Sequence, residues 1–264
     1  MAVLLTAPAP TGTSGYTLLI ADDDAQVAAA QRLRHQVFAE ELGATLHTLR
    51  SGLDIDPFDE HCDHLLVRDD STGQVVGTYR MLPPDRVGRA GGRYAEAEFD
   101  LTALRPLTDQ LVEIGRSCVH PEHRSGAVIN LMWAGIARYL HLRGLRWLGG
   151  CASVPLDDGG TTAAGVWDRF ATRHLSPPAL RVRPGRPWLA EPAGAAAVSA
   201  RLAAGADAPR VGVPALLKGY LRLGAWVCGE PAYDPDFDVA DFYVLLSMDR
   251  MHPRYRRHFL GEES

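Results

Sequence analysis

The sequence predicts an α/β fold, with a mixed central β-sheet flanked by helices on both faces. Short apolar runs of strand length alternate along the chain with longer segments whose apolar residues recur every three or four positions. The resulting order is strand, helix, three strands, helix, strand, helix and two strands, which favours helices packed around one sheet. With 264 residues, the chain is long enough to bury a sizeable core.

The N-terminal elements follow from local signals. Residues 1–15 contain no basic residue, so they lack the charged region of a signal peptide, and we expect a disordered lead-in. Residues 16–21 form the first predicted strand. The acids at 22–24 supply an N-cap for a helix that should run to about Leu42 and end at Gly43. The stripe predicted to be buried on this helix consists of Val27, Ala30, Leu33, Val37, Phe38 and Leu42.

A β-hairpin is predicted next, because strands at 64–68 and 75–82 flank the turn sequence DDSTG. Residues 96–104 should pack at the edge of the sheet. The segment QLVEIGRSCVHPEHRSG, at 110–126, is predicted to begin as a strand and to end as a loop. An apolar helix over 127–143 should follow that loop.

The C-terminal half is predicted to continue the same alternation. Its strands are expected at 146–153, 225–229 and 241–247, and its helices at 161–174, 214–223 and 253–260. Residues 177–192 are rich in Pro and Arg and should be irregular, whereas 193–208 form either an Ala-rich helix or a flexible insert. We expect 16–261 to form a single domain with a Pro/Arg/Ala-rich insert around 177–210.

Composition narrows the functional classes. The net charge of −5 and the pI near 6.0 argue against general nucleic-acid binding. No apolar run approaches the ~20 residues needed to span a bilayer, so any membrane contact is expected to be peripheral, at the inner face. The widely spaced cysteines indicate reduced core thiols of a cytoplasmic protein, and neither a disulfide nor a metal site. They are Cys62, Cys118, Cys151 and Cys228.

The predicted central strand contains two opposite charges, Glu113 and Arg116. Side chains alternate between the faces of a strand, so residues three apart point to opposite sides unless a bulge intervenes. Two interpretations stay open from the residues alone. The pair either holds strands together as a buried ion pair or serves a chemical function.

Other charges have competing interpretations as well. The loop at 51–63 is dense in acid, but it lacks the spacing of a calcium-binding EF-hand. It could receive an amine-bearing substrate, although solvation is the usual explanation for such a run. Arg34 lies close to the apolar stripe of the first helix, and its local pattern favours a surface side chain with an apolar stem. Arg80 lies near the end of a hairpin strand.

Common catalytic motifs are absent, including GxSxG, Walker A, GxGxxG after a first strand, and HExxH. A thiol nucleophile formed by Cys118 with His120 is disfavoured, because Pro121 ends the strand. The loop at 123–128 instead feeds a helix N-terminus, which offers free N–H groups and a positive dipole end to a phosphate. A simple helix cap is the alternative.

The strand, loop and helix at 110–143 resemble the acyl-CoA pyrophosphate site of the GNAT acyltransferase fold, whose loop pattern is R/Q-x-x-G-x-G/A. His123 and Val128 depart from that pattern. The resemblance is compatible with a donor that carries a single phosphate, such as phosphopantetheine on an acyl carrier protein.

A narrower resemblance extends from about residue 16 to residue 261. Several segments resemble the ornithine-lipid N-acyltransferases, also labelled hemolysin-like acyltransferases, and more distantly the acyl-homoserine-lactone synthases. They include RLRHQVFAEELGA, AEFDL and EIGRSCVHPEHRSG, and the longer stretches at 58–82 and 216–246. The synthase pattern of helix Arg and Phe, loop acids, strand Arg and Glu-x-x-Arg matches Arg34, Phe38, Asp59, Asp63, Arg80, Glu113 and Arg116.

This resemblance implies transfer of a (3-hydroxy)fatty acyl group from acyl carrier protein to the α-amine of an amino acid, ornithine above all. Acyl-CoA is the alternative donor, and no bound cofactor or metal is expected. Glu113 would accept the amine proton, and Arg116 would fix Glu113. Arg34 and Arg80 would grip a carboxylate, with Asp59 and Asp63 holding an ammonium group. The expected oxyanion and phosphopantetheine contacts are Cys118, Val119, Arg124, Ser125 and Gly126.

Two other functions remain open. One is signal synthesis of the acyl-homoserine-lactone type, or acylation of another amine. The other is a non-catalytic module that binds acyl carrier protein. For a donor carried by acyl carrier protein, clustered arginines are expected to attract the acidic carrier, although each one alone is more simply a solvated residue. They are Arg124, Arg138, Arg143, Arg146, Arg250, Arg254, Arg256 and Arg257.

Overall fold

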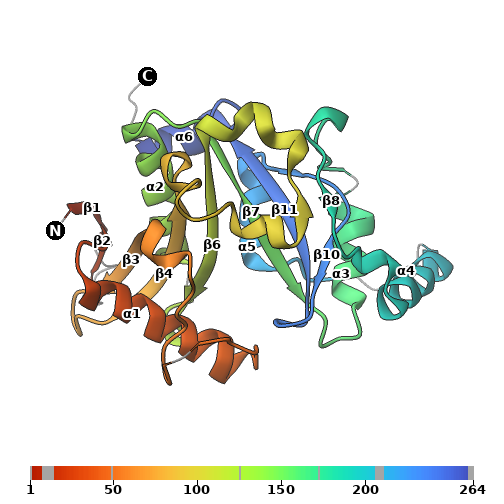
Figure 1. Ribbon diagram of the computed structural model, residues 1–264, viewed down its shortest axis with the longest axis horizontal. Helices are drawn as coiled ribbons and strands as arrows, with labels where there is room; N and C mark the ends of the chain where they lie inside the picture. Colours follow the sequence, from red (N-terminus) through yellow and green to blue (C-terminus); the bar gives the residue numbers. More distant parts are fainter. Residues whose placement is uncertain are drawn as a thin grey trace. The chain divides into compact units, whose positions relative to one another are not determined.

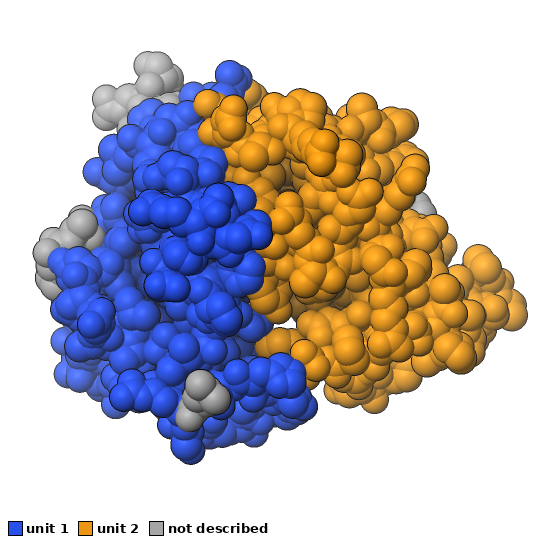
Figure 2. All heavy atoms as spheres, viewed as in Figure 1, with its two compact units in different colours: residues 1–92, 112–146, 253–264 blue, residues 93–111, 147–252 orange. Residues whose placement is uncertain are grey.

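The computed structural model describes residues 2–7, 15–48, 50–124, 126–171, 173–205 and 211–260. The chain divides into two compact units that interleave along the sequence (Figure 2). Unit 1 comprises 1–92, 112–146 and 253–264, and unit 2 comprises 93–111 and 147–252. This division does not test the expected single domain over 16–261, which stays a prediction.

The sheet of unit 1 is antiparallel throughout. Its strands follow the order β1 (Ala2–Ala7), β2 (Tyr16–Ile20), β3 (Asp63–Asp69), β4 (Val75–Leu82) and β6 (Leu111–Val119). The predicted hairpin and central strand are confirmed. Strand β1 corrects the expectation that all of 1–15 is disordered. Its backbone pairs with β2, which would otherwise be an open edge; the remaining lead-in lies outside the described residues except for Gly15.

Helices cover both faces of this sheet (Figure 1). Helix α1 (Asp24–His35) packs Ala30 against Leu19 and Leu66. Helix α2 (Ala127–Leu142) covers the opposite face, where a Cβ added to Gly135 would lie 2.4 Å from Leu18. Because neighbouring strand residues alternate between faces, Leu18 and Leu19 serve different helices.

The end of the first helix differs from its prediction. Asp23 caps α1 by accepting a hydrogen bond from the backbone of Gln26 at 2.8 Å. After His35 the chain continues as a π-helix, Gln36–Glu41, and Gly43 follows with a φ of 72°. Leu42 is 59% exposed, so its predicted place in the buried stripe is wrong. The wider π turn moves Leu42 out of register with the α-helical stripe.

Unit 2 contains a second antiparallel sheet segment, in which β11 (Val239–Ser247) pairs with β7, β9 and β10. Those strands are β7 (Trp147–Pro155), β9 (Trp226–Val227) and β10 (Ala232–Asp234); separately, β5 (Phe99–Asp100) pairs with β8 (Arg183–Pro184). Every residue of β11 is buried. The unit's helices are α3 (Thr161–Val166), continued as a π-helix over Trp167–Ala171, α4 (Pro192–Ala204) and α5 (Ala215–Leu223).

Helix α4 decides one alternative in the predicted insert. The Ala-rich segment is a helix over most of 193–208, although 206–210 lie outside the described residues. Gly194 lies against Trp188, where an added Cβ would come within 2.1 Å of the Trp188 carbonyl oxygen. A side chain at position 194 would therefore push α4 away from this contact.

Short 3₁₀ turns connect these elements, and the tail helix completes unit 1. The turns are Asp59–His61, Pro84–Arg86, Tyr94–Ala97, Thr102–Gln110, Pro121–His123, Pro178–Leu180 and Trp188–Ala190. Helix α6 (Pro253–Leu260) packs on α2. Among the described residues, no helix is both long and apolar enough to cross a membrane.

Candidate functional site

Strand β6 contains a β-bulge opposite β4. Cys118 pairs with Thr78. The next pair joins Gly115 to Arg80, so two residues of β6, Arg116 and Ser117, lie opposite one residue of β4, Tyr79. Arg116 lies in the bulge with a φ of 51°, in the left-handed region that residues other than glycine seldom adopt. The bulge therefore shifts the alternation of side chains along β6.

Because of this bulge, Glu113 and Arg116 reach the same side of the sheet. Glu113 pairs with Leu82, two residues from Arg80 on β4, so Glu113 and Arg80 share a face. The Arg116 guanidinium lies 2.9 Å from Asp56, which itself lies 2.7 Å from Arg80. The bulge thus places Glu113 and Arg116 on one side of the sheet, although residues three apart on a regular strand would point to opposite sides.

Asp59 is the centre of a buried hydrogen-bond network on this face. Arg34 donates from Nη1 to Oδ1 at 3.0 Å and from Nη2 to Oδ2 at 2.6 Å. Gln31 donates to Oδ2 at 2.9 Å, and Arg80 donates to Oδ1 at 3.2 Å. Burial alone would raise the pKa of Asp59, but Arg34 and Arg80 outweigh it and hold that pKa well below its usual range. Asp59 is therefore ionised.

Two further aspartates complete the network. Asp54 Oδ2 lies 2.9 Å from Nε of Arg34 and 3.4 Å from Nε of Arg116. Asp56 bridges the remaining cations, with Oδ1 at 2.7 Å from Arg80 and Oδ2 at 2.9 Å from Arg116. Burial opposes the charge of Arg80, yet Asp56 raises the pKa of Arg80 above its ordinary value. Three guanidinium groups and three carboxylates thus compensate one another away from water.

Two interpretations based on local sequence are wrong. Arg34 is 0% exposed and is not a surface side chain. Three acids of the loop at 51–63 are buried rather than solvated, with Asp54 at 3%, Asp56 at 8% and Asp59 at 7% exposure, whereas Glu60 is exposed. Their buried state depends on arginines from α1, β4 and β6, which a local pattern does not contain.

Sequence reasoning missed Asp54, Asp56 and Gln31 as members of this network. The available signal was the spacing Asp-x-Asp-x-x-Asp at 54–59, together with an arginine beside an apolar helix stripe. Buried charges need partners of opposite sign, so an arginine near such a stripe predicts nearby carboxylates.

Glu113 is 5% exposed and lies within electrostatic reach of this network. Burial above all, together with the charges of Asp59 and Glu113 and against the opposing effect of Arg80, raises the pKa of the Cys62 thiol to about 12. Phe38 packs on the apolar cluster of Leu33, Val37 and Cys118 on the same face of the sheet. Of the predicted residues, Arg34 and Arg80 contact Asp59 directly. Arg116 joins them through Asp54 and Asp56, and Glu113 shares their side of the sheet.

Asp63 lies apart from Asp59. It accepts hydrogen bonds from the Tyr139 hydroxyl at 2.6 Å and from Arg86 and Arg143 at 2.9 Å each. Burial and Asp63 together raise the pKa of Tyr139 above its ordinary value. Because Tyr139 belongs to α2, Asp63 points to the opposite side of the sheet, and the structure does not bring the two predicted ammonium ligands together.

The predicted phosphate loop leads into α2. Gly126 has a φ of 96° and precedes the helix without a side-chain cap. Arg124 donates from Nε to the Val119 carbonyl at 3.0 Å and contacts Glu41 with both terminal nitrogens. Ser125 lies outside the described residues. Burial raises the pKa of Cys118 to about 12, which supports the prediction against a thiol nucleophile.

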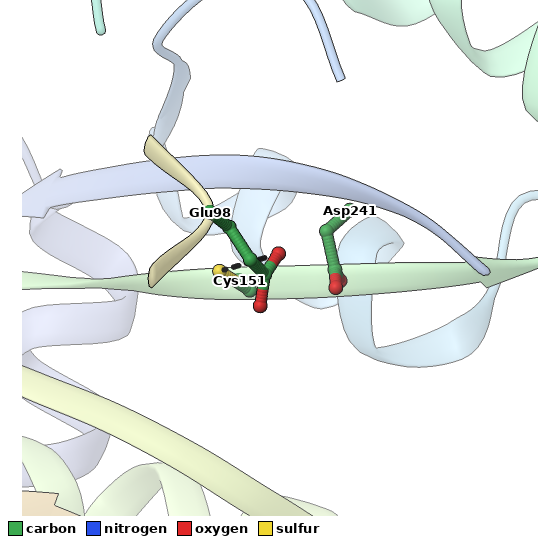
Figure 3. A group of neighbouring side chains, drawn as sticks. All are labelled: Glu98, Cys151 and Asp241. Atoms are coloured by element: carbon green, nitrogen blue, oxygen red, sulfur yellow. Dashed lines mark hydrogen bonds between the residues drawn. The ribbon is translucent and has the colours of Figure 1, made fainter. Parts of the chain in front are cut away.

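A separate polar group occurs in unit 2 (Figure 3). The ligand atoms of Glu98, Cys151 and Asp241 lie within 4.8 Å of one another. Burial, followed by the negative charge of Asp241, raises the pKa of Glu98 to about 10, so Glu98 keeps its proton at neutral pH. Ser153 donates to Asp241 at 2.6 Å. The proton on Glu98 reduces the charge repulsion between its carboxyl group and that of Asp241.

Known proteins resemble this chain across the region that contains the buried network. Residues 33–134 match the family described as acetyltransferase (GNAT) domain. An L-ornithine N(alpha)-acyltransferase of Rhodobacter capsulatus is 36% identical, over 92% of this chain and 94% of the relative. That of Brucella abortus is 33% identical, over 92% and 88%. This chain belongs to the L-ornithine N(alpha)-acyltransferase family. The expected family and acyltransferase class are confirmed.

The fold of this L-ornithine N(alpha)-acyltransferase family member is similar to the folds of solved structures. The AHL synthase LasI matches with a TM-score of 0.52 at 14% identity, covering 95% of this chain and all of LasI. BjaI, a CoA-dependent acyl-homoserine lactone synthase, matches with a TM-score of 0.51 at 16% identity, covering 91% and 84%. The predicted GNAT-like α/β fold is therefore confirmed.

Proposed function

We propose that this protein transfers a (3-hydroxy)fatty acyl group from acyl carrier protein to the α-amine of ornithine, as in ornithine-lipid synthesis. The observation that carries the proposal is the identity of 36% to an L-ornithine N(alpha)-acyltransferase over 92% of this chain. The product would be a lyso-ornithine lipid. The proposed location is the cytoplasm, with peripheral contact at the inner membrane face for release of this amphiphile.

The reaction requires a neutral amine and an acceptor for one proton. The amine nitrogen attacks the thioester carbonyl carbon while an N–H proton passes to Glu113, directly or through water. Backbone N–H groups near Cys118 and Val119 are proposed to stabilise the oxyanion. Collapse then breaks the C–S bond, and the pantetheine thiolate leaves and takes up a proton. Glu113 is the proposed catalytic residue.

The buried network is proposed to position this base. Arg116 lies in the bulge of β6, three residues beyond Glu113, and its guanidinium contacts Asp54 and Asp56. The backbone conformation of Arg116 therefore sets the local path of the strand. Arg34 has no exposed surface, so it would act on the substrate only through Asp59 and Asp54. Arg80 keeps a small exposed surface of 4%, so the direct carboxylate contact is assigned to Arg80.

The donor is proposed to enter at the start of α2, where Arg124 and Gly126 lie. The arginines expected to dock the carrier belong to both units, since Arg250 lies in unit 2, where it stacks on Trp226 at 4.0 Å. Helices α2 and α6 pack together in unit 1 (Figure 1), and both carry exposed arginines. They are Arg138, Arg254, Arg256 and Arg257, with Arg143 and Arg146 just beyond α2. We assign carrier docking to this set, and acyl-CoA is the alternative donor.

One incubation tests the function. The protein is mixed with acyl carrier protein thioester and a panel of amines, and amide products are identified by mass. Ornithine should give the dominant product. A lactone product from S-adenosylmethionine would favour signal synthesis, and preference for another amine would reassign the acceptor. Carrier binding without any product would favour the non-catalytic module.

A further inference from the structure

Glu41 and Arg124 form an ion pair at the proposed phosphate position. The two Glu41 carboxylate oxygens lie 2.6 Å and 2.8 Å from Nη1 and Nη2 of Arg124. The remaining edge of the guanidinium is occupied as well, because Nε donates to the Val119 carbonyl at 3.0 Å. A guanidinium offers two edges for bidentate contact with an anion. A phosphate can therefore gain a bidentate contact with Arg124 only by displacing Glu41.

The surroundings keep this pair charged but accessible. Its hydrogen bond to Arg124 lowers the pKa of Glu41, against a smaller opposing effect of burial. The same hydrogen bond raises the pKa of Arg124. The Glu41 side chain is 32% exposed and that of Arg124 is 44% exposed. Water can reach both groups, so exchange of one anion for another does not require unfolding.

Glu41 also lies where the chain can move aside. It is the last residue of the π-helix, and Gly43 follows in the left-handed region, where no atom of the described residues lies within 4 Å of an added Cβ. The same π-helix contacts the loop before α2 a second time, since Gln36 lies 3.2 Å from His120. Loss of the Glu41 contact would thus leave the π-helix attached at its other end.

We propose that Glu41 is a specificity-determining residue that blocks Arg124 until a phosphate-bearing donor displaces it. This inference rests on the proposed function, in which the donor phosphate binds at the start of α2. The phosphodiester of a carrier-bound donor carries one negative charge, as a carboxylate does, but unlike Glu41 it also meets the N–H groups at the start of α2. Thioesters without a phosphate cannot replace Glu41 and would bind without Arg124.

The test compares two non-transferable ligands, an acyl-phosphopantetheine thioether and the same thioether without its phosphate. Binding to the full chain is measured by calorimetry for the wild type, Glu41→Gln and Glu40→Gln. Glu40 is the matched control, because its carboxylate pairs with His35 at 3.1 Å and not with Arg124. Removal of a partly exposed competitor should tighten binding of the phosphorylated ligand ~2–5-fold. The ligand without phosphate should bind all three proteins equally.

A second variant isolates the arginine. Glu41→Gln combined with Arg124→Gln should lose the gain and should bind the phosphorylated ligand no better than the wild type. The inference is overturned if Glu41→Gln binds the phosphorylated ligand no better than the wild type, or if both ligands gain equally. No amine and no acyl transfer are involved, so these results stand apart from the choice of acceptor. Absence of ornithine acylation would remove the proposed function and leave the Glu41 result intact.

Discussion

Glu113 is a buried carboxylate on a strand that also bears the αL residue Arg116. A base held in one geometry beside a fixed network can accept a proton without first being reorganised. We expect Glu113→Gln to lower kcat by at least ~10²-fold, the usual size of a general-base contribution, with the fold intact. Steady-state rates and circular dichroism of the same preparation measure both. Full activity in this variant would leave Glu113 a structural residue.

Asp59 makes the stability of the protein depend on pH in the acidic range. Its pKa is depressed in the folded protein, so it adds stability above the ordinary aspartate pKa of about 3.9, and this stability is lost as pH falls below that value. Wild-type unfolding free energy should therefore fall more steeply between about pH 5 and pH 3 than that of Asp59→Asn. Urea titrations across this range give the slopes. Asp157→Asn, at an exposed position, should keep the wild-type slope.

At the scale of elements, the bulge in β6 is the feature that joins strand and network. A non-glycine residue in the left-handed region is disfavoured by ~1–2 kcal/mol, so the contacts of Arg116 must compensate for its φ of 51°. Replacement of Arg116 by Ala or Gly removes one of the two cations that contact each of Asp54 and Asp56. Arg116→Ala and Arg116→Gly differ mainly in the free energy needed to hold the backbone at positive φ.

Arg116→Ala and Arg116→Gly should both lose most activity and stability, because two buried carboxylates lose a cation. Arg116→Gly should nevertheless be more stable by about 1 kcal/mol, since glycine adopts positive φ readily. Denaturant unfolding of both variants measures the difference. Equal stability would mean that the bulge relaxes once the guanidinium is gone.

At the scale of the whole molecule, charge is unevenly distributed. The net charge is −5, whereas α6 and the end of α2 expose several arginines. A positive face on an acidic protein raises the association rate with an acidic carrier, and salt screens that effect. Such a face changes how fast donors arrive more than it changes the chemistry at Glu113.

We expect a higher kcat/KM with acyl carrier protein thioester than with the same acyl-CoA, by an amount that shrinks as salt rises. Rates with both donors at low and high ionic strength measure it. Arg254, Arg256 and Arg257 changed together to Gln should remove most of the advantage. The same change at three other exposed arginines, Arg89, Arg105 and Arg183, is the matched control. Equal use of acyl-CoA, insensitive to salt, would exclude carrier docking.

Much of the fold follows from local patterns, and the exceptions have physical causes. The hairpin and β11 are apolar strands with strong turn or length signals, so their positions are predictable. Strand β1 is missed because its pairing with β2 supplies the order. The π-helix over 36–41 is missed as well, since apolar spacing predicts a continuous α-helix to Leu42.

The candidate site likewise has features that can be predicted from the sequence and features that cannot. The chemical groups, including Glu113, Arg116, Arg34 and Asp59, can be selected from residue type and family resemblance. Their arrangement depends on the bulge in β6 and on the packing of α1 over β4, because both bring together residues that are far apart in the chain. Sequence alone therefore determined the fold class, the family and the candidate groups. Which charges are buried and paired follows from the tertiary fold, because the free energy of burying a charge depends on partners that the local sequence does not supply.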